Sequence, residues 1–506
     1  MTSQEKILTL DALAAAVGKD RAALRRIVHC HGVFDLLHIG HIRHLTQARA
    51  MGDVLVVTLT ADRFVDKGPH RPAFPEGYRA EALASLSCVD YVAVNPWPTA
   101  EETLRKLRPD VYVKGQEFKD TGSDMTGKAG REAQVVREVG ARFAFTEDVV
   151  YSSTNLINRY LSSLPKEIED YLGFFRKRYD LDEVLASVDR MGTMRVGVVG
   201  DAILDDYRYC EAIGKSSKDP VLALKSLSHD TFAGGALAVA NHVAGFAGEV
   251  RLFTRLGCDG REGFVRERLR PNVTMHAAVQ PGAPTLVKRR YLDGYSFNKL
   301  LEVYEMDDAE LPPAEDEVFR QALSRGMEGC DVVIAADFGH GAISAATVGM
   351  LSERAPFLSV NTQANAGNRG FHTISRYPRA DFGCLAEHEL RLETRDLTGA
   401  VRPLVERAGR RLSAGMFAVT LGRAGCTVWS DDKFVEVPAF ATKTVDRVGA
   451  GDAFLSIAAL AAARKATPEI VGFLGNIAGA LTVEVLGNQK PVDALSVKKF
   501  VTSLLK

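Results

Sequence analysis

Short apolar runs alternate with stretches of helical periodicity along most of this chain, and this alternation limits the folds it can adopt. Over residues 25–115 the runs are RRIVHCHGVF, DVLVVTLT, DYVAV and DVYVKG, and they are separated by segments such as HIRHLTQARAM and YRAEALASL. Apolar runs of four to eight residues favour buried strands, and their alternation with helices indicates βαβ units around a parallel sheet. The sequence therefore predicts an α/β fold.

A second α/β block begins at MRVGVVGDAIL and runs to the C-terminus. The extended segments VLALKSL, PTLVKRRYL and KLLEVYEM interrupt its alternation, as a small β lid on a larger α/β body would. Between the blocks, the sequence is charged and helical in period. We therefore predict a first domain over residues 1–164, a helical linker over 165–192 and a second domain over 193–506.

Composition narrows the classes of protein that need to be considered. A length of 506 residues favours more than one domain, and 63 basic against 64 acidic residues argue against nucleic acid or an anionic membrane as the main partner. Seven scattered cysteines without a C-x-x-C pair are typical of reduced thiols. The N-terminus is charged, unlike a secretory signal, and the apolar run FLSIAALAAA is too short to span a bilayer. We expect a soluble cytoplasmic protein.

The stretch HCHGVFDLLHIGHIRHL, at residues 29–45, holds five histidines. A zinc site is one interpretation, but His38 and His41 have only Asp35 nearby as a further ligand at typical spacing. The glycine between them favours close approach of an anion to the start of a helix. Two imidazoles in that position can donate hydrogen bonds to a phosphate and stabilise charge that develops on it.

The first domain resembles the nucleotidyltransferases that carry an HxGH motif, in their cytidylyltransferase-like branch. The resemblance rests on GVFDLLHIGHIRHL and on three later segments in the expected order: KGPHRP, DVYVKG and YSSTNLI. It implies that His38 and His41 stabilise the transferred α-phosphate of ATP, CTP or GTP. It also implies nucleotide contacts for Gly32, Phe34, Asp35, Lys67, Arg79, Lys114, Ser152, Ser153 and Thr154.

A second candidate site is VGAGDAF, where small residues and an aspartate open an apolar helix. Small residues at a helix N-terminus leave backbone N–H groups free to face an anion, and Asp452 could accept a proton from an attacking hydroxyl. The alternative is an ordinary N-cap aspartate after a glycine turn.

Residues 193–506 resemble the PfkB, or ribokinase-like, carbohydrate kinases. The resemblance rests on VGDAILDDY, FAGGALAVANHVA, VTLGRAG, VDRVGAGD and GNIAGALTVEVLG. It implies that Asp452 is the catalytic base, that Mg²⁺ and ATP are needed, and that Glu387 serves the metal. The implied ATP-binding residues are Thr420, Gly422, Gly425, Gly449, Ala450, Gly451 and Asn476, and the implied sugar-binding residues are Asp205, Gly234 and Gly235.

Both halves resemble bifunctional heptose 7-phosphate kinase/heptose 1-phosphate nucleotidyltransferases, with the two domains in reversed order. The resemblance implies phosphorylation of a sugar phosphate at its anomeric hydroxyl, followed by nucleotidyl transfer with release of pyrophosphate. The alternative is a cytidylyltransferase for a polyol or amino-alcohol phosphate, fused to a sugar kinase of different or lost activity that serves as a sensing or dimerising module. Kinases of this type are often dimers through the β lid, so we expect a homodimer.

The kinase part departs from these relatives at clustered positions. Ala238, His340 and Cys384 replace an asparagine, a lysine and a second asparagine, and Gln363 ends an Asn-Thr-Gln triplet where relatives carry Asp-Pro-Lys. Exchanging polar residues in a pocket changes which substrate it accepts, so we expect altered substrate preference, with loss of activity as the alternative. Lys288, Arg289 and Arg290 could supply replacement charge, or could be a solvated strand face.

Overall fold

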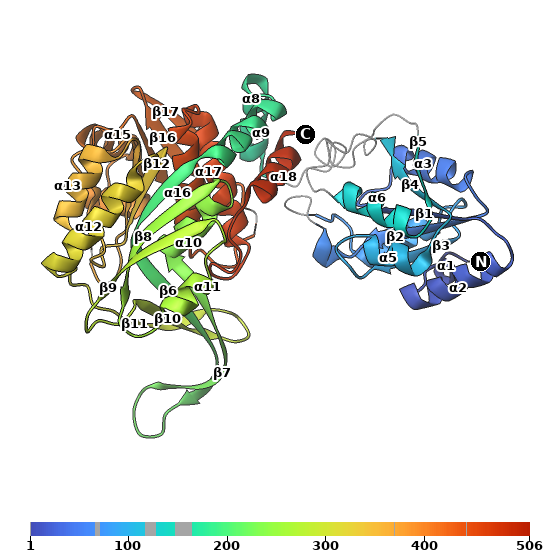
Figure 1. The fold of residues 1–506 in the computed structure, drawn as a ribbon, viewed down its shortest axis with the longest axis horizontal. Helices are drawn as coiled ribbons and strands as arrows, with labels where there is room; N and C mark the ends of the chain where they lie inside the picture. Colours follow the sequence, from blue (N-terminus) through green and yellow to red (C-terminus); the bar gives the residue numbers. More distant parts are fainter. Residues whose placement is uncertain (1, 66–70, 117–127, 147–163, 369, 442) are drawn as a thin grey trace. The chain divides into compact units, whose positions relative to one another are not determined.

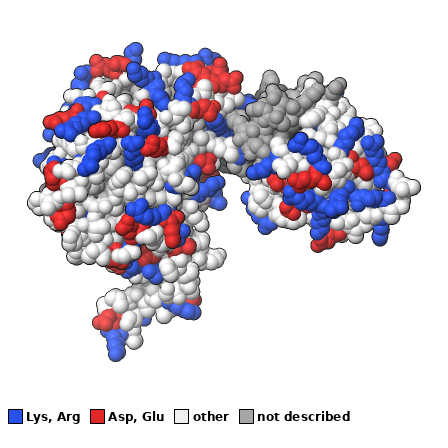
Figure 2. All heavy atoms as spheres, in the orientation of Figure 1, with Lys and Arg blue, Asp and Glu red and all other residues white. Residues whose placement is uncertain are grey.

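The fold is that of a computed structural model that describes residues 2–65, 71–116, 128–146, 164–368, 370–441 and 443–506 (Figure 1). The chain forms two compact units, Met1–Ser163 with Thr502–Lys506, and Leu164–Val501. No helix in the described ranges is long and apolar enough to cross a membrane. Basic and acidic side chains are interspersed over the face shown in Figure 2, in keeping with their nearly equal numbers.

The first unit is built on a parallel sheet of order β3-β2-β1-β4-β5. Its strands are β1 Ile27–Gly32, β2 Val54–Thr60, β3 Tyr91–Asn95, β4 Val111–Gly115 and β5 Arg142–Thr146. Its helices are α1 Ser3–Lys6, α2 Leu10–Ala22, α3 Ile39–Arg49, α4 Glu76–Ala84, α5 Glu101–Leu107 and α6 Lys128–Glu138. Every residue of β2 is buried, as expected for a strand covered on both faces. The strand order reverses between β1 and β4, and parallel α/β sheets bind ligands outside the carboxyl ends of their strands at such a point.

The second unit has a larger sheet, with the main strand order β11-β10-β6-β12-β13-β14-β15-β16-β17; β7 and β8 also pair with β6, and β9 pairs with β8. The strands are β6 Arg195–Lys215, β7 Leu222–Gly235, β8 Glu249–Gly257, β9 Val273–Gln280, β10 Val287–Asp293, β11 Lys299–Glu305, β12 Val332–Asp337, β13 Leu358–Thr362, β14 Phe382–Ala386, β15 Met416–Thr420, β16 Cys426–Ser430 and β17 Lys433–Val437. The α/β architecture predicted for both blocks is confirmed.

One strand, β6, belongs both to the body sheet and to the β lid, which also contains β7, β10 and β11. The first seven residues of β6 run parallel to β8 and β12, and the rest pairs antiparallel with β7 and parallel with β10. Figure 1 shows the β6–β7 hairpin projecting beyond the rest of the unit. The sequence predicted the lid, but it did not show that one strand of 21 residues belongs to both the body and the lid.

The helices that follow residue 164 flank the body sheet or pack on other helices. They are α8 Lys166–Arg178, α9 Leu181–Asp189, α10 Ala236–Ala244, α11 Glu262–Glu267, α12 Pro313–Met327, α13 Ala345–Arg354, α14 Glu387–Thr394, α15 Val401–Arg411, α16 Ala450–Ala463, α17 Pro468–Val483 and α18 Ala494–Leu505. One core lies beneath α12, α13 and α15, while α10, α16 and α17 pack together. Helix α16 is apolar on all sides and almost wholly buried, which fixes the residues that open it.

Candidate active sites

The HxGH segment begins helix α3. His38 is the N-cap of the helix, and its Nδ1 accepts a hydrogen bond from the Gly40 amide at 3.1 Å. The proton of neutral His38 therefore lies on Nε2, which can donate to a phosphate. Burial lowers the pKa of His38 and favours this neutral form. The ring of His41 stacks on that of His38 with centroids 4.0 Å apart, so the structure brings the two predicted imidazoles together.

The turn between β1 and α3 depends on Gly32 and Phe34. Phe34 has a φ of 49°, and its ring packs edge-on against His41 with centroids 5.4 Å apart. A Cβ on Gly32 would lie 3.1 Å from the Phe34 ring, closer than a side chain can settle without moving it. Gly32 thus leaves room for the Phe34 ring, and that ring packs against His41.

Two residues predicted to contact the nucleotide bind the protein itself. Asp35 is buried, pairs with Arg71 at 2.9 Å and accepts a hydrogen bond from the Ala73 amide at 2.6 Å. Arg79 is also buried and donates to four groups of the protein. They are the carbonyl oxygens of Val33 at 2.5 Å, Thr60 at 2.9 Å and Phe74 at 2.9 Å, and Asp62 Oδ1 at 2.5 Å. Through these bonds Asp35 and Arg79 position the turn between β1 and α3, and their contact with a nucleotide stays a prediction.

Lys114, at the end of β4, is held in the interior of the first unit. Its ammonium group pairs with buried Glu132 at 2.9 Å and donates to the backbone oxygen of His31 at 3.3 Å. Lys114 therefore stabilises the end of β1 through its hydrogen bond to His31. The predicted nucleotide ligands Lys67, Ser152, Ser153 and Thr154 lie outside the described residues.

The three other histidines of the segment contact threonine hydroxyls of the protein. His29 Nε2 lies 2.8 Å and His31 Nδ1 lies 2.9 Å from the Thr58 hydroxyl, and His44 Nδ1 lies 2.8 Å from that of Thr146. Burial lowers the pKa of His29 to about 3 and that of His44 to about 4. Both rings therefore stay neutral at physiological pH.

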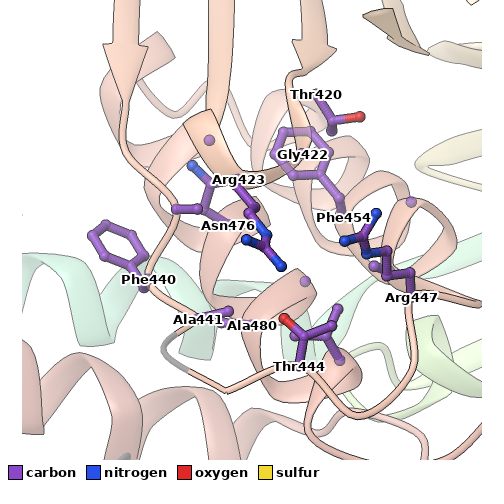
Figure 3. Close-up of a pocket in the computed structure, with 16 residues that line it drawn as sticks. Thr420, Gly422, Arg423, Phe440, Ala441, Thr444, Arg447, Phe454, Asn476 and Ala480 are labelled. Atoms are coloured by element: carbon purple, nitrogen blue, oxygen red, sulfur yellow. The ribbon is translucent and has the colours of Figure 1, made fainter. Parts of the chain in front are cut away.

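The kinase part holds two adjoining cavities at the carboxyl ends of the central strands. The first, of about 560 Å³, is shown in Figure 3 and extends between the turn after β15, α16 and α17. The second, of about 330 Å³, lies between the lid strands β6 and β10 and the ends of β13 and β14. Three residues line both cavities: Thr420, Arg447 and Gly451.

Every residue predicted to bind ATP lines one of these cavities. Thr420, Gly422, Gly425, Ala450, Gly451 and Asn476 line the first and Gly449 lines the second. Gly449 has a φ of 83°, and a Cβ there would lie 2.1 Å from Asn488 Oδ1. The Asn476 amide donates to the backbone oxygens of Val437 and Pro438, at 3.0 and 3.2 Å, and so fixes one wall of the first cavity.

The second cavity is lined by Asp205, Gly235, Lys288 and Arg290 from the predicted sugar-binding set. Asp205 forms a buried ion pair with Arg290. Gly234 stands behind it, where a Cβ would lie 2.2 Å from Asp205 Oδ2. Burial lowers the pKa of Lys288, which makes no ion pair with any described residue. Arg289 instead pairs with Asp206 and Glu305 and does not line this cavity.

Asp452 lies in the first turn of α16 and lines the second cavity. Burial, followed by the neighbouring carboxylates Asp205 and Glu389, raises the pKa of Asp452 to about 7. Its Oδ1 accepts a hydrogen bond of 2.8 Å from the Gln363 amide. A carboxylate with a pKa near neutrality is suited to accept a proton from a hydroxyl group.

The carboxylate that faces the second cavity near Asp452 is Glu389, not the predicted metal ligand Glu387. Glu387 pairs with Arg391 one turn along α14, at 2.7 Å. Glu389 is buried, accepts hydrogen bonds from the Ala364 and Ala386 amides, and has a pKa raised by burial to about 7. No group of three metal-ligating side chains occurs among the described residues. Mg²⁺ carried by ATP needs only one or two carboxylates, so Glu389 and Asp452 fit it better than Glu387.

The departures from the kinase relatives divide into two groups. Gln363 and Cys384 line the second cavity, whereas Ala238 is buried within α10 away from it. His340 lies behind the cavity, where its Nδ1 is 2.7 Å from Asp308, and burial lowers its pKa. Only the first group can touch a bound sugar directly.

Sequence reasoning missed Arg423, Arg447 and Glu389, which line the cavities and lie near predicted residues in the sequence. It noted Gln363 as a departure, but not its contact with Asp452. Arg447 could have been found, because it directly precedes the glycine-rich turn VGAGD.

Comparison with known families follows the same division of the chain. Residues 29–159 match the cytidylyltransferase-like family model, and residues 194–495, more than half of the chain, match that of the pfkB family of carbohydrate kinases. The chain belongs to the pfkB family. It is an enzyme in which a cytidylyltransferase-like domain precedes the pfkB kinase domain.

Curated relatives match over the N-terminal domain. The bifunctional protein HldE of Citrifermentans bemidjiense is 39% identical over 164 residues, which are 32% of this chain and 32% of the relative. That of Geobacter sulfurreducens is 38% identical over 167 residues, again 32% of each chain. The chain thus spans about a third of the length of the curated relatives it matches.

Solved structures match the pfkB part. Phosphofructokinase-2 from Escherichia coli in complex with substrates and products has a TM-score of 0.52 at 16% identity, and the match covers 62% of this chain and all of that one. The same enzyme in complex with fructose-6-phosphate has a TM-score of 0.51 at 15% identity and the same coverage. These likenesses show the kinase fold.

Proposed function

We propose that this pfkB-family enzyme makes a nucleotide-activated sugar in two steps. The kinase domain phosphorylates the anomeric hydroxyl of a heptose 7-phosphate-like sugar, and the transferase domain joins the sugar 1-phosphate to a nucleotide. A separate phosphatase removes the 7-phosphate in between. The observation that carries the kinase step is Asp452, a buried carboxylate with a pKa near neutrality beside the junction of two cavities. Both steps use nucleoside triphosphates, so we place the enzyme in the cytoplasm.

The kinase step follows from the geometry around Asp452. The sugar hydroxyl gives its proton to Asp452, and its oxygen forms a bond to the γ-phosphorus of ATP. The bond from that phosphorus to the bridging oxygen breaks, and ADP leaves with the electron pair. Backbone N–H groups at Gly449, Ala450 and Gly451 stabilise charge on the phosphoryl group in flight, and Mg²⁺ adds further positive charge when bound.

The transferase step uses the paired imidazoles of His38 and His41. An oxygen of the sugar 1-phosphate bonds to the α-phosphorus of a nucleoside triphosphate, and the bond to the bridging oxygen breaks to release pyrophosphate. His38 donates from Nε2, the tautomer that its bond to the Gly40 amide selects, to charge that develops on the phosphate.

Phosphorus NMR of the purified protein with ATP, Mg²⁺ and D-glycero-D-manno-heptose 7-phosphate tests the kinase step. We expect an anomeric phosphate signal that is absent with Asp452→Asn. For the transferase step, sugar 1-phosphate with ATP, CTP or GTP in parallel should release pyrophosphate for one base. Release with glycerol 3-phosphate instead, and no kinase product, would favour the polyol cytidylyltransferase alternative.

We further propose that the β lid makes the enzyme a homodimer. The β6–β7 hairpin exposes large apolar side chains, which is unusual for a surface in contact with water alone. They are Ile213 (63% exposed), Val221 (57%), Leu222 (53%) and Leu227 (54%). Light scattering should give twice the chain mass of 55.0 kDa, and Leu222→Asp should halve the measured mass.

A further inference from the structure

Arg447 occupies the junction of the two kinase cavities. It is the only charged residue among the three that line both. Figure 3 shows the guanidinium groups of Arg447 and Arg423 pointing into the first cavity, here called the nucleotide cavity, from opposite sides. Arg423 lines the first cavity but not the second. Of these two cations, only Arg447 can therefore reach the region through which a group passes from one cavity to the other.

No described residue neutralises the charge of Arg447. Its side chain makes no ion pair and no hydrogen bond with any described residue, and it is exposed to the cavity. The other arginine that lines the second cavity, Arg290, forms ion pairs with Asp205 and Glu302. An unpaired guanidinium beside the second cavity, which Asp205, Glu389 and Asp452 line, has a free planar fork of donors for a phosphate.

The backbone that carries Arg447 is fixed on its N-terminal side. The buried carboxylate of Asp446 accepts hydrogen bonds from the Tyr207 hydroxyl and the Lys299 ammonium, each at 2.8 Å. It also accepts bonds from the Val448 and Gly487 amides, at 3.2 and 3.1 Å. Tyr207 and Lys299 belong to the lid strands β6 and β11, so the lid braces the segment that presents the arginine.

The backbone is fixed on its C-terminal side as well. Gly449 takes a left-handed conformation in which a side chain would collide with Asn488, and the buried helix α16 starts at the next residue. An arginine on a rigid segment loses little backbone entropy when it binds, so its charge is already organised for a reaction.

We propose that Arg447 is a catalytic residue of the kinase site, whose guanidinium binds the γ-phosphoryl group as it passes from ATP to the sugar hydroxyl. The inference rests on the proposed kinase function. Oxygen of the hydroxyl bonds to the γ-phosphorus, its proton goes to Asp452, and the bond to the bridging oxygen breaks as ADP leaves. Arg447 offsets negative charge on the transferring group and on that leaving oxygen, where it is greatest in the transition state.

Steady-state kinetics of the full chain with ATP, Mg²⁺ and heptose 7-phosphate test this role. Arg447→Gln should lower kcat about 100- to 1,000-fold while the KM for ATP changes much less, and Arg447→Lys should restore part of the rate. The matched variant Arg423→Gln should raise the KM for ATP more than it lowers kcat. A kcat of Arg447→Gln within threefold of wild type, with an unchanged unfolding temperature, would overturn the proposal.

A binding measurement separates this inference from the proposed function. Calorimetry compares AMP with the non-hydrolysable β,γ-imido analogue of ATP, each with Mg²⁺. Arg447→Gln should weaken binding of the analogue about tenfold and leave AMP affinity within twofold, because only the analogue has a γ-phosphate. Wild type that forms no ADP with the sugar would refute the proposed substrate alone. Equal losses for both nucleotides would refute the role of Arg447.

Discussion

The ionisation of Asp452 controls the proposed kinase step, because only its unprotonated form accepts a proton. Asp205 from β6 and Glu389 from α14 raise its pKa together with burial, whereas Lys288 from β10 and the Gln363 amide lower it. We expect kcat to fall about tenfold per pH unit below pH 7. Gln363→Met removes a donor to the carboxylate, so the acid limb should move to higher pH, and Gln363→Lys should move it to lower pH. A pH series of kcat that is identical in all three proteins would contradict this account.

The space behind Asp205 depends on the absence of a side chain at Gly234. A Cβ there would lie 2.2 Å from Asp205 Oδ2, so Gly234→Ala must displace the carboxylate and its ion pair with Arg290. A displacement of about 1 Å in a catalytic site costs about 100-fold in rate, and we expect that loss in kinase kcat/KM. Gly263→Ala is the control, because a Cβ at Gly263 has nothing within 4 Å and lies in helix α11. That variant should keep its activity.

Among the strands, those made of apolar residues are predicted well from the sequence, whereas the polar second half of a long strand such as β6 is predicted poorly. The buried run of β2 is clear from the sequence because a strand covered on both faces must be apolar. β6 continues from its apolar start into DDYRYCEAIGK, which carries no comparable pattern. That half remains a strand because β7 and β10 pair with it on either side. Such pairing is a property of the fold and cannot be seen in a local window of sequence.

Helix α8 supports the nucleotide cavity from outside. Phe175 is 1% exposed and stacks on Phe473 with centroids 4.3 Å apart, and Phe473 packs edge-on against Phe440, which lines the cavity. Phe175→Ala should lower the free energy of unfolding by about 3–5 kcal/mol and raise the KM for ATP. Phe174, the next residue, is 59% exposed, and Phe174→Ala should change stability by less than about 0.5 kcal/mol. Urea unfolding of both variants checks the difference; equal stabilities would show that α8 does not brace the cavity.

At the scale of the whole molecule, a contiguous motif can be located from the sequence, whereas a contact between distant segments cannot. The turn before α16 and the pair His38–His41 are local, and the structure places them at cavity or helix positions that suit phosphate. Arg79 could not be placed from sequence, because its acceptors come from three separate segments. The contact between Gln363 and Asp452 joins residues 89 positions apart and exists only in the folded chain.

The two proposed activities use residues from separate units, because His38 lies in the first and Asp452 in the second. His38→Ala should therefore lower nucleotidyl transfer about 100- to 1,000-fold and leave the kinase rate within twofold of wild type, while Asp452→Asn should do the reverse. Because sugar phosphates diffuse freely, an equal mixture of the two variants, supplied with the phosphatase, should form nucleotide-sugar from heptose 7-phosphate. Each variant alone should form almost none. Chromatography of the nucleotide-sugar measures this, and a mixture as inactive as its components would mean that the two steps require both sites in one intact chain.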